Sequence, residues 1–209
     1  ARVSAAARRA GLRVHLDGAR IWNAVAATGH SEADYAQHAD TVSCCFSKGL
    51  GAPCGSAVAG DRATIARVFR FRKMFGGAMR QAGLLAAAAL HALDHHRERL
   101  ADDHANARAL ADGLAAIPGL QLAMPVPTNM VFFDLDAGLG PAAAFCARLK
   151  ELGVLVLATT PRRVRAVCHL DVSAAHVRDA LTIIARAASE AHRPAERRSP
   201  GRGLAAHAG

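Results

Sequence analysis

The sequence has few aromatic residues, no closely spaced cysteine pair and no long apolar run. Aromatic side chains make up 4% of the 209 residues, which argues against a surface that stacks single-stranded nucleic acid, because such surfaces are built from aromatic rings. No apolar run reaches the roughly 18 residues that a membrane helix needs, and no cationic, apolar leader opens the chain. We therefore expect a cytoplasmic protein without membrane contact.

The cysteines are odd in number and lack any C-x-x-C pair, and most lie in apolar segments. The five are Cys44, Cys45, Cys54, Cys146 and Cys168. This usage is typical of reduced thiols in a protein core. Apolar residues reach 52%, which is ample for a buried core.

The formal charge of +9 raises the possibility of a polyanion partner. The basic residues are scattered, however, over residues 67–73, 162–165 and 193–202, with acidic residues between them. This pattern favours solvated helix faces, so we expect no nucleic-acid partner. The alternative, a basic nucleic-acid-binding module, would show salt-sensitive binding without any cofactor.

The organisation predicted is an α/β chain in three parts. Residues 1–117 read as the later part of a large domain, residues 118–190 as a small α/β domain, and residues 191–209 as a disordered tail rich in Arg, Pro, Gly and Ala. The chain begins without methionine inside a helical segment, so we expect the fold to start upstream.

Hydrophobic periodicity and turn residues predict the individual elements. Strands are expected at 12–16, 41–46, 56–59, 120–122, 130–135, 154–157 and 164–168. Helices are expected at 2–9, 19–27, 141–152 and 173–188, with a further helical stretch from the N-cap Asp61 to residue 116, broken at 76–77 and 99–102. The run 81–93 is apolar on nearly every face, which is typical of a helix buried in a large domain or a subunit interface.

Two short motifs at strand ends carry the chemistry. Asp17 follows the first strand in HLDGAR, and about thirty residues later Lys48 follows the second strand in SKGLGAP. Side chains at such strand ends project from one edge of an open α/β sheet. Pyridoxal phosphate needs an amine for a Schiff base and an anion beside its pyridine nitrogen. Lys48 and Asp17 supply both, although either motif alone is more often a turn or a solvated loop.

The same loop does not match the glycine pattern of a dinucleotide-binding site. Gly49, Gly51 and Gly55 have the wrong spacing for that fingerprint, and Pro53 stands where its helix should start.

Three longer strings carry a family resemblance. HLDGARIWNA, SKGLGAPCGSAVAG and RKMFGGAMRQAG, in this order and spacing, resemble the threonine aldolase family of fold-type I pyridoxal-phosphate enzymes. The resemblance continues in residues 128–131 and 165–173. It implies an aspartate-aminotransferase-type α/β fold, with the later part of the large domain followed by the small C-terminal domain.

The resemblance also implies roles for single residues. Lys48 would be the catalytic Schiff-base lysine, and Asp17 would pair with the pyridine nitrogen. Arg20 and Arg165 would together hold the substrate α-carboxylate, for which guanidinium forks are well suited. No residue is expected to bind a metal.

Two further cations are implied to act across a subunit boundary. Lys73 and Arg80 match family positions that reach the cofactor phosphate of a neighbouring subunit, so a homo-oligomer, dimer or tetramer, with shared active sites is expected. The alternative is that both are surface charges on a helix.

The implied reaction is cleavage of threonine, allo-threonine and related β-hydroxy-α-amino acids to glycine and an aldehyde. The cofactor-stacking histidine and the phosphate-cupping loop of family members lie in a first half that this chain does not contain, so we expect impaired activity from the chain alone. Cys168 stands where threonine is common, which we interpret as packing. Alternatives are another pyridoxal-phosphate lyase or transaminase, and a non-catalytic fragment.

The histidines have simpler interpretations. His91 and His95 are one helical turn apart, with His96 and His104 following. A metal site there would lack a carboxylate or cysteine partner, so structural roles are favoured. His169 could line the site beside Arg165 or be a structural histidine.

Overall fold

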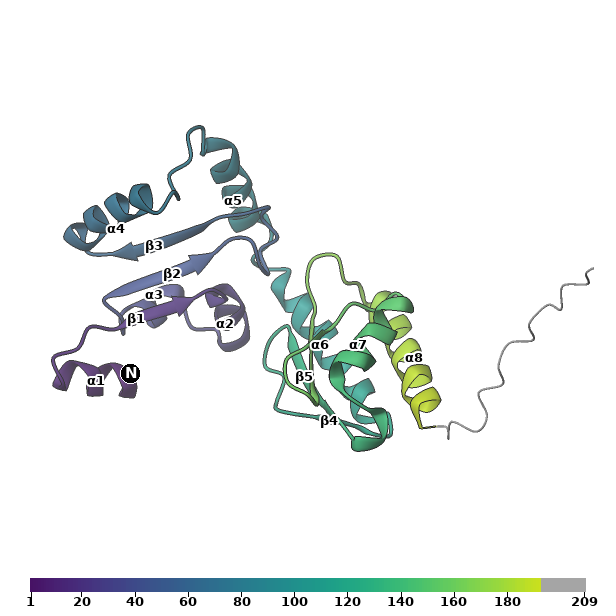
Figure 1. Cartoon of the computed structure of the whole chain (residues 1–209). Coiled ribbons are helices and arrows are strands. Elements are labelled where there is room, and N and C mark those ends of the chain that lie inside the picture. Colours follow the sequence, from purple (N-terminus) through teal and green to yellow (C-terminus); the bar gives the residue numbers. More distant parts are fainter. Residues whose placement is uncertain (193–209) are drawn as a thin grey trace, which may run out of the picture.

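A computed structural model describes residues 1–192, which contain two separate sheets (Figure 1). The first sheet has the strand order β1-β2-β3 and the second β4-β5-β7-β6. The strands are β1 His15–Gly18, β2 Thr41–Cys45, β3 Ser56–Gly60, β4 Leu120–Leu122, β5 Met130–Leu135, β6 Leu157–Ala158 and β7 Arg163–Val167. The helices are α1 Arg2–Arg9, α2 Ile21–Thr28, α3 Glu32–Ala36, α4 Arg62–Met74, α5 Gly83–His95, α6 Leu100–Ala115, α7 Ala142–Glu151 and α8 Ala174–Ala191, with the 3-10 turn η1 Ala137–Leu139.

The first sheet pairs a parallel and an antiparallel neighbour. β1 runs parallel to β2, with Asp17 opposite Ser43, and β3 returns antiparallel to β2. A small core of buried residues packs beside it, including Trp22, Val42 and Leu50. Every residue of β3 is exposed, so this sheet contributes little buried surface of its own.

The second sheet holds the larger core. β5 alternates half-buried and buried residues, as expected for a strand with one face against helices. Val131, Phe133 and Val164 are completely buried between this sheet and its helices. Helix α8 begins with a capping box in which the Ser173 side chain accepts from the His176 N–H and the His176 side chain contacts the Ser173 N–H.

Helix α6 connects the two sheets (Figure 1). Its N-terminal half packs on α2 of the first region, and its remaining buried residues join the core of the second. Asn106 of α6 donates from Nδ2 to the carbonyl oxygen of Val172 at 2.9 Å, which ties the helix to the segment after β7.

Most predicted elements are present, with shifted ends. The break in the long helical stretch lies at residues 96–99 and not at 99–102, and β6 comes three residues later than predicted. Helix α3 was not predicted. The sheet changes between α6 and β4, close to the predicted boundary at 117, but the three-part division stays a prediction. Of the predicted tail, residue 191 ends α8, and residues 193–209 lie outside the described part.

Of the two environments predicted for the apolar helix at 81–93, burial inside the domain is not found within the described chain, and burial in a subunit interface stays a prediction. Only Ala89 and Ala92 of α5 are buried, while Leu84 is 80% exposed. The apolar faces of α5 extend beyond the small core of the first region, and no other element within residues 1–192 covers them.

The cysteine prediction is correct in part. All five cysteines are free thiols, but Cys146 and Cys168 alone are buried, and Cys54 is exposed. Cys54 lies in the loop after β2 and not on a strand or helix face. None of the helices among residues 1–192 is both long enough and apolar enough to span a membrane.

Candidate active site

Asp17 lies in β1 at the edge where the parallel strands end. Its Oδ1 accepts a hydrogen bond from the Ala19 N–H at 3.0 Å, which orients the carboxylate while leaving it exposed. A Cβ at the next residue, Gly18, would lie 2.7 Å from the carbonyl oxygen of Ser43. Only glycine therefore lets β1 approach β2 this closely beside Asp17.

Lys48 lies in a closed loop after β2. The Phe46 N–H donates to the Gly55 carbonyl at 3.0 Å, and the Ala52 N–H donates to the Phe46 carbonyl at 3.1 Å. Leu50 is 1% exposed and anchors the loop in the core, whereas Lys48 itself is exposed. The loop thus has a fixed backbone and presents the Lys48 amine outward, beyond the strand that neighbours Asp17.

His15 shares the open face with Asp17, and sequence reasoning missed it. Its Nδ1 lies 2.8 Å from Thr41 Oγ1 and its Nε2 lies 3.3 Å from Ser43 Oγ, both on β2. Alternate residues of a strand point to the same face, so the two-residue spacing between His15 and Asp17 was the available signal.

Arg20 and Arg165 come together from the two regions. Arg20 is the N-cap residue of α2, and Arg165 lies in the middle of β7. Burial lowers the pKa of Arg20, and the nearby Arg165 charge lowers it further. The Nε atoms of both are buried without a hydrogen-bond partner among the described residues.

Two neighbouring guanidinium groups with unpartnered buried nitrogens are electrostatically unfavourable without an anion. Arg163, two residues before Arg165 on β7, is by contrast paired with Asp134 through two bonds of 2.8 Å. The Arg20–Arg165 pair therefore has the chemistry of a carboxylate site, close to the edge that carries Asp17.

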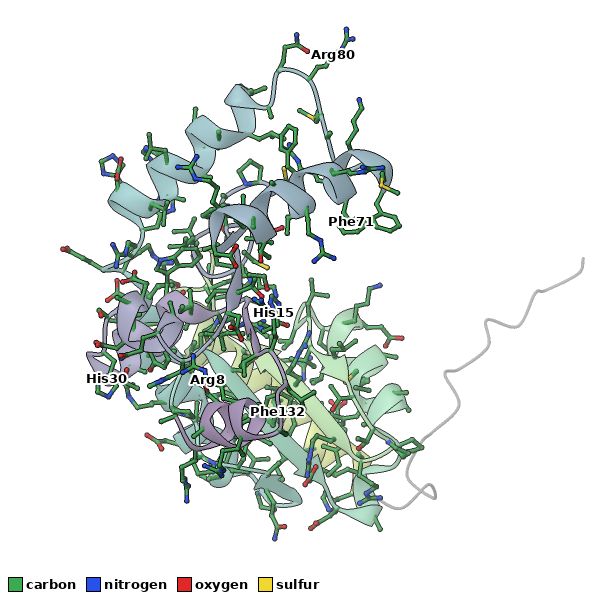
Figure 2. The ribbon with its side chains drawn as sticks, turned by 90° about the vertical axis from the view of Figure 1, so that its left-hand side faces the viewer. Arg8, His15, His30, Phe71, Arg80 and Phe132 are labelled. Carbon is green, nitrogen blue, oxygen red and sulfur yellow. The ribbon has the colours of Figure 1, made fainter. Side chains whose placement is uncertain are left out.

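Lys73 and Arg80 do not join this cluster within the described chain. Lys73 lies near the end of α4, and Arg80 lies in the following connection; both are exposed. Figure 2 shows Arg80 at the tip of that connection, far from His15. The described chain thus brings Arg20 and Arg165 together and places Asp17 and Lys48 on neighbouring strand ends, whereas Lys73 and Arg80 lie apart.

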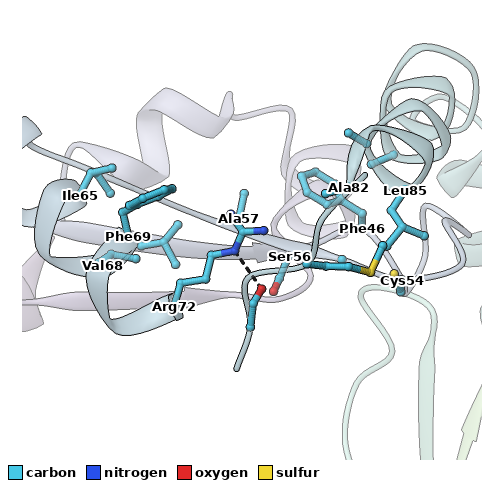
Figure 3. A pocket seen from close by; sticks show the side chains of 16 residues that line it. Phe46, Cys54, Ser56, Ala57, Ile65, Val68, Phe69, Arg72, Ala82 and Leu85 are labelled. Carbon is cyan, nitrogen blue, oxygen red and sulfur yellow. Dashed lines mark hydrogen bonds between the residues drawn. The ribbon is translucent and has the colours of Figure 1, made fainter. Parts of the chain in front are cut away.

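A separate apolar groove lies away from these residues. It has a volume of about 770 Å³ and lies between β3, α4 and α5. Its lining is mostly apolar, and its one charged residue, Arg72, donates from Nε to the Gly77 carbonyl at 2.9 Å (Figure 3). Lys48 and Asp17 do not line this groove, and it lacks the polar groups that would orient an amino acid.

The remaining histidines form no metal site among residues 1–192, where no group of three His, Cys, Asp or Glu side chains is arranged to hold an ion. His91 and His95 stack with ring centroids 4.4 Å apart. His169 is exposed, with its Nδ1 3.6 Å from Asp171 Oδ2.

A family model and curated relatives both match this chain. The family model described as beta-eliminating lyase matches residues 1–137. The low specificity L-threonine aldolase of Escherichia coli K12 is 45% identical over 79% of this chain and 48% of its own length. The low-specificity L-threonine aldolase 1 of Arabidopsis thaliana is 38% identical over 89% of this chain and 52% of its own length. The resemblance noted in the sequence is confirmed.

A solved structure, Oryza sativa TDC with PLP and tryptamine, has a TM-score of 0.71 at 22% identity and covers 91% of this chain and 45% of its own. This likeness shows the fold, so the predicted fold class is confirmed. The chain spans about half the length of the curated relatives it matches.

Proposed function

Because the chain belongs to the beta-eliminating lyase family, we propose that it acts with pyridoxal phosphate to cleave threonine, allo-threonine and related β-hydroxy-α-amino acids to glycine and an aldehyde. The observation that carries the proposal is the Arg20–Arg165 pair, two unpartnered cations beside the edge that presents Asp17 and Lys48. The names of the relatives, low-specificity threonine aldolases, support the choice of substrate.

The residues at this edge fit the cofactor by their chemistry. The Lys48 amine is exposed on a fixed loop and would hold the cofactor's aldehyde carbon covalently. The Asp17 carboxylate, oriented by the Ala19 N–H, would keep the proton on the pyridine nitrogen. When bound, the protonated cofactor ring withdraws electrons from the substrate Cα.

The arginine pair would bind and orient the substrate. Each guanidinium can offer two parallel N–H groups to a carboxylate, and the buried Nε atoms of Arg20 and Arg165 are free to take part. Binding the α-carboxylate at this point would fix the direction of the Cα–Cβ bond, which is the bond that breaks. The anion would also relieve the repulsion between the two cations.

Oligomer formation is part of the proposal. Lys73 and Arg80 are exposed on α4 and the connection after it, so they are free to reach the phosphate site of a second subunit. A dimer or tetramer with shared active sites would then be the active form. We propose a cytoplasmic location and a role in threonine breakdown and glycine supply.

A second candidate reaction uses the same residues. The family description names β-elimination, which would release an oxo acid and ammonia from the same amino acids. A transaminase would instead transfer the amino group. Lys48 and Asp17 serve all three reactions, so the products distinguish them.

The test is product analysis with threonine and added pyridoxal phosphate on the full-length protein, because the chain spans about half the length of its relatives. The proposal predicts glycine and acetaldehyde in equal amounts, lost in Lys48→Ala and retained in the matched control Lys150→Ala, which also removes an exposed lysine. Formation of 2-oxobutyrate and ammonia would show that the reaction is β-elimination and not aldol cleavage. A product that persists in Lys48→Ala would remove Lys48 from its role.

A further inference from the structure

A buried polar pair lies directly behind the lysine loop. Asn23 of α2 and His104 of α6 are each 3% exposed, and Asn23 Nδ2 lies 3.1 Å from His104 Nε2. Burial and the nearby Arg108 lower the pKa of His104, so its imidazole is neutral and Nε2 accepts the hydrogen bond from the Asn23 amide. The pair joins helices that are 81 residues apart in the chain.

Asn23 is packed against the residue that follows Lys48. A Cβ built on Gly49 would lie 2.9 Å from Asn23 Oδ1 and 2.9 Å from Leu100 Cδ2. The Asn23 amide and Leu100 therefore leave no room for a side chain at Gly49. The Asn23 amide thus borders the backbone directly after Lys48.

A second histidine holds the far side of the same loop. His96 Nδ1 lies 2.6 Å from the Leu50 carbonyl oxygen, to which it donates. Within the loop, the Gly51 N–H donates to the Lys48 carbonyl at 2.9 Å, and Gly51 has a φ of +74°, which favours glycine. The loop is thus held from α2 and α6 on one side and from the end of α5 on the other.

We propose that Asn23, His104 and His96 are positioning residues that hold the backbone on both sides of Lys48, so that its amine is presented at a fixed place beside Asp17. The inference rests on the proposed function of Lys48. Neither histidine touches the cofactor or the substrate in this scheme. Their effect is transmitted through the Asn23 amide and the Leu50 carbonyl.

The arrangement explains two features that catalysis alone does not require. Lys48 is exposed and is not itself fixed by a hydrogen bond within the described chain, so its position depends on its backbone. Asn23 and His104 are also among the few fully buried polar residues, and a buried polar pair is costly unless its hydrogen bonds are satisfied. The hydrogen bond between them offsets part of this cost, and holding the loop gives a reason for a polar pair at this position.

The test is amide hydrogen exchange on the full chain without cofactor. The Gly51 and Ala52 amides report on the loop, because both donate inside it. His104→Leu removes the acceptor at similar volume and should speed exchange at these two amides at least about tenfold, with α7 unchanged. His104→Gln, whose side-chain oxygen can still accept from Asn23, should restore the wild-type rates within about twofold.

His96 provides an independent test that does not disturb the buried pair. His96→Leu removes the donor to Leu50 and should speed exchange at Gly51 and Ala52 in the same way, whereas His96→Asn should rescue it through its amide N–H. The matched control is His30→Leu, because the exposed ring of His30 packs against Tyr35 and not against His96 or the loop. Loop exchange that is unchanged in both His104→Leu and His96→Leu would overturn the proposal.

Borohydride reduction after adding pyridoxal phosphate separates this inference from the proposed function. The proposal predicts that labelling of Lys48 slows in His104→Leu and recovers in His104→Gln. Suppose that Lys48 is labelled in the wild-type protein and that neither leucine variant changes the labelling rate or the loop exchange rate. This result would remove the positioning role and leave the proposed function intact. Altered loop exchange together with no labelling of Lys48 in the wild-type full-length protein would remove the proposed function.

Discussion

The two sheets differ in how much apolar surface they bury and in which candidate site residues they carry. In the second sheet, Val131 and Phe133 of β5 are completely buried and join a core that includes three helices. In the first sheet, β3 is exposed along its whole length, and a smaller cluster around Trp22 and Leu50 forms the core. Yet the first sheet carries Asp17 and Lys48.

In this chain the residues proposed to react therefore lie where little apolar surface is buried. The second region adds one element of the site, Arg165, from a strand that its core holds rigidly. Arg165 is held by the rigid second sheet, and the Lys48 loop is held by Asn23, His104 and His96. Together these supports would keep the geometry of the site fixed although the first sheet has a small core. Four changes of decreasing expected effect test this division.

The largest effect is expected in the core of the second sheet. Phe133→Ala removes a completely buried ring and should lower the free energy of unfolding by about 3–5 kcal/mol. Val58→Ala in β3, where the side chain is 40% exposed, should change it by less than about 1 kcal/mol. Denaturant titration followed by circular dichroism measures both, and equal effects would contradict the comparison.

The arginine pair should affect binding without supporting stability. Arg165→Gln should weaken glycine binding about 30-fold, since a hydrogen bond to a charged group contributes about 2 kcal/mol. The free energy of unfolding should not fall, because Arg165 has an unpartnered Nε and lies near the like charge of Arg20. Titration calorimetry of the cofactor-loaded protein measures the affinity.

Arg163→Gln is the matched control for that change. It removes a guanidinium from the same strand that is already paired with Asp134, so glycine affinity should stay at the wild-type value. Equal weakening by both variants would indicate a general effect of charge and would argue against a specific carboxylate site.

A smaller effect is expected at the helix caps. Ser173→Ala breaks the capping box of α8 and should lower the free energy of unfolding by about 1 kcal/mol, because α8 packs on the larger core. Asp61→Ala removes the cap of α4, which has no buried residue. It should fray α4 with little change in global unfolding, as measured by amide exchange of residues 62–65.

The smallest effect concerns acid stability. The hydrogen bonds from Arg163 lower the pKa of Asp134 below its usual value. The folded state thus binds this proton less readily than the unfolded state, so the pair stabilises the protein above pH about 4 and the contribution is lost as pH falls through the lowered pKa. In Asp134→Asn, the free energy of unfolding, measured by denaturant titration at several pH values, should fall less steeply as the pH drops below about 4. An identical pH profile would show that this half-buried pair contributes nothing to stability.

The sequence predicted the local part of this architecture well. Strand ends at Asp17 and Lys48 were recognisable because turn residues follow each apolar run, and Asp61 was correctly predicted as the cap of α4. Helix α3 was missed because it has only five residues, although Ser31 and Asp34 form the spacing of a capping box. β6 was misplaced because the apolar run before it resembles a strand.

The non-local part could not be predicted. The Asn23–His104 contact joins residues 81 positions apart, and the Arg20–Arg165 approach depends on how α6 connects the two sheets. Neither leaves a periodic or spacing signal in one sequence. The apolar pattern of α5 likewise left open whether the domain or a second subunit covers it, since such a pattern indicates that a surface should be covered and does not show what covers it.

The most direct test of the account is peptide mapping after borohydride reduction with pyridoxal phosphate. The chain contains three lysines, Lys48, Lys73 and Lys150, and all three are exposed, so simple accessibility would label them alike. The account predicts that the cofactor becomes fixed to Lys48, with little label on the other two. Label spread evenly over the three lysines would contradict it.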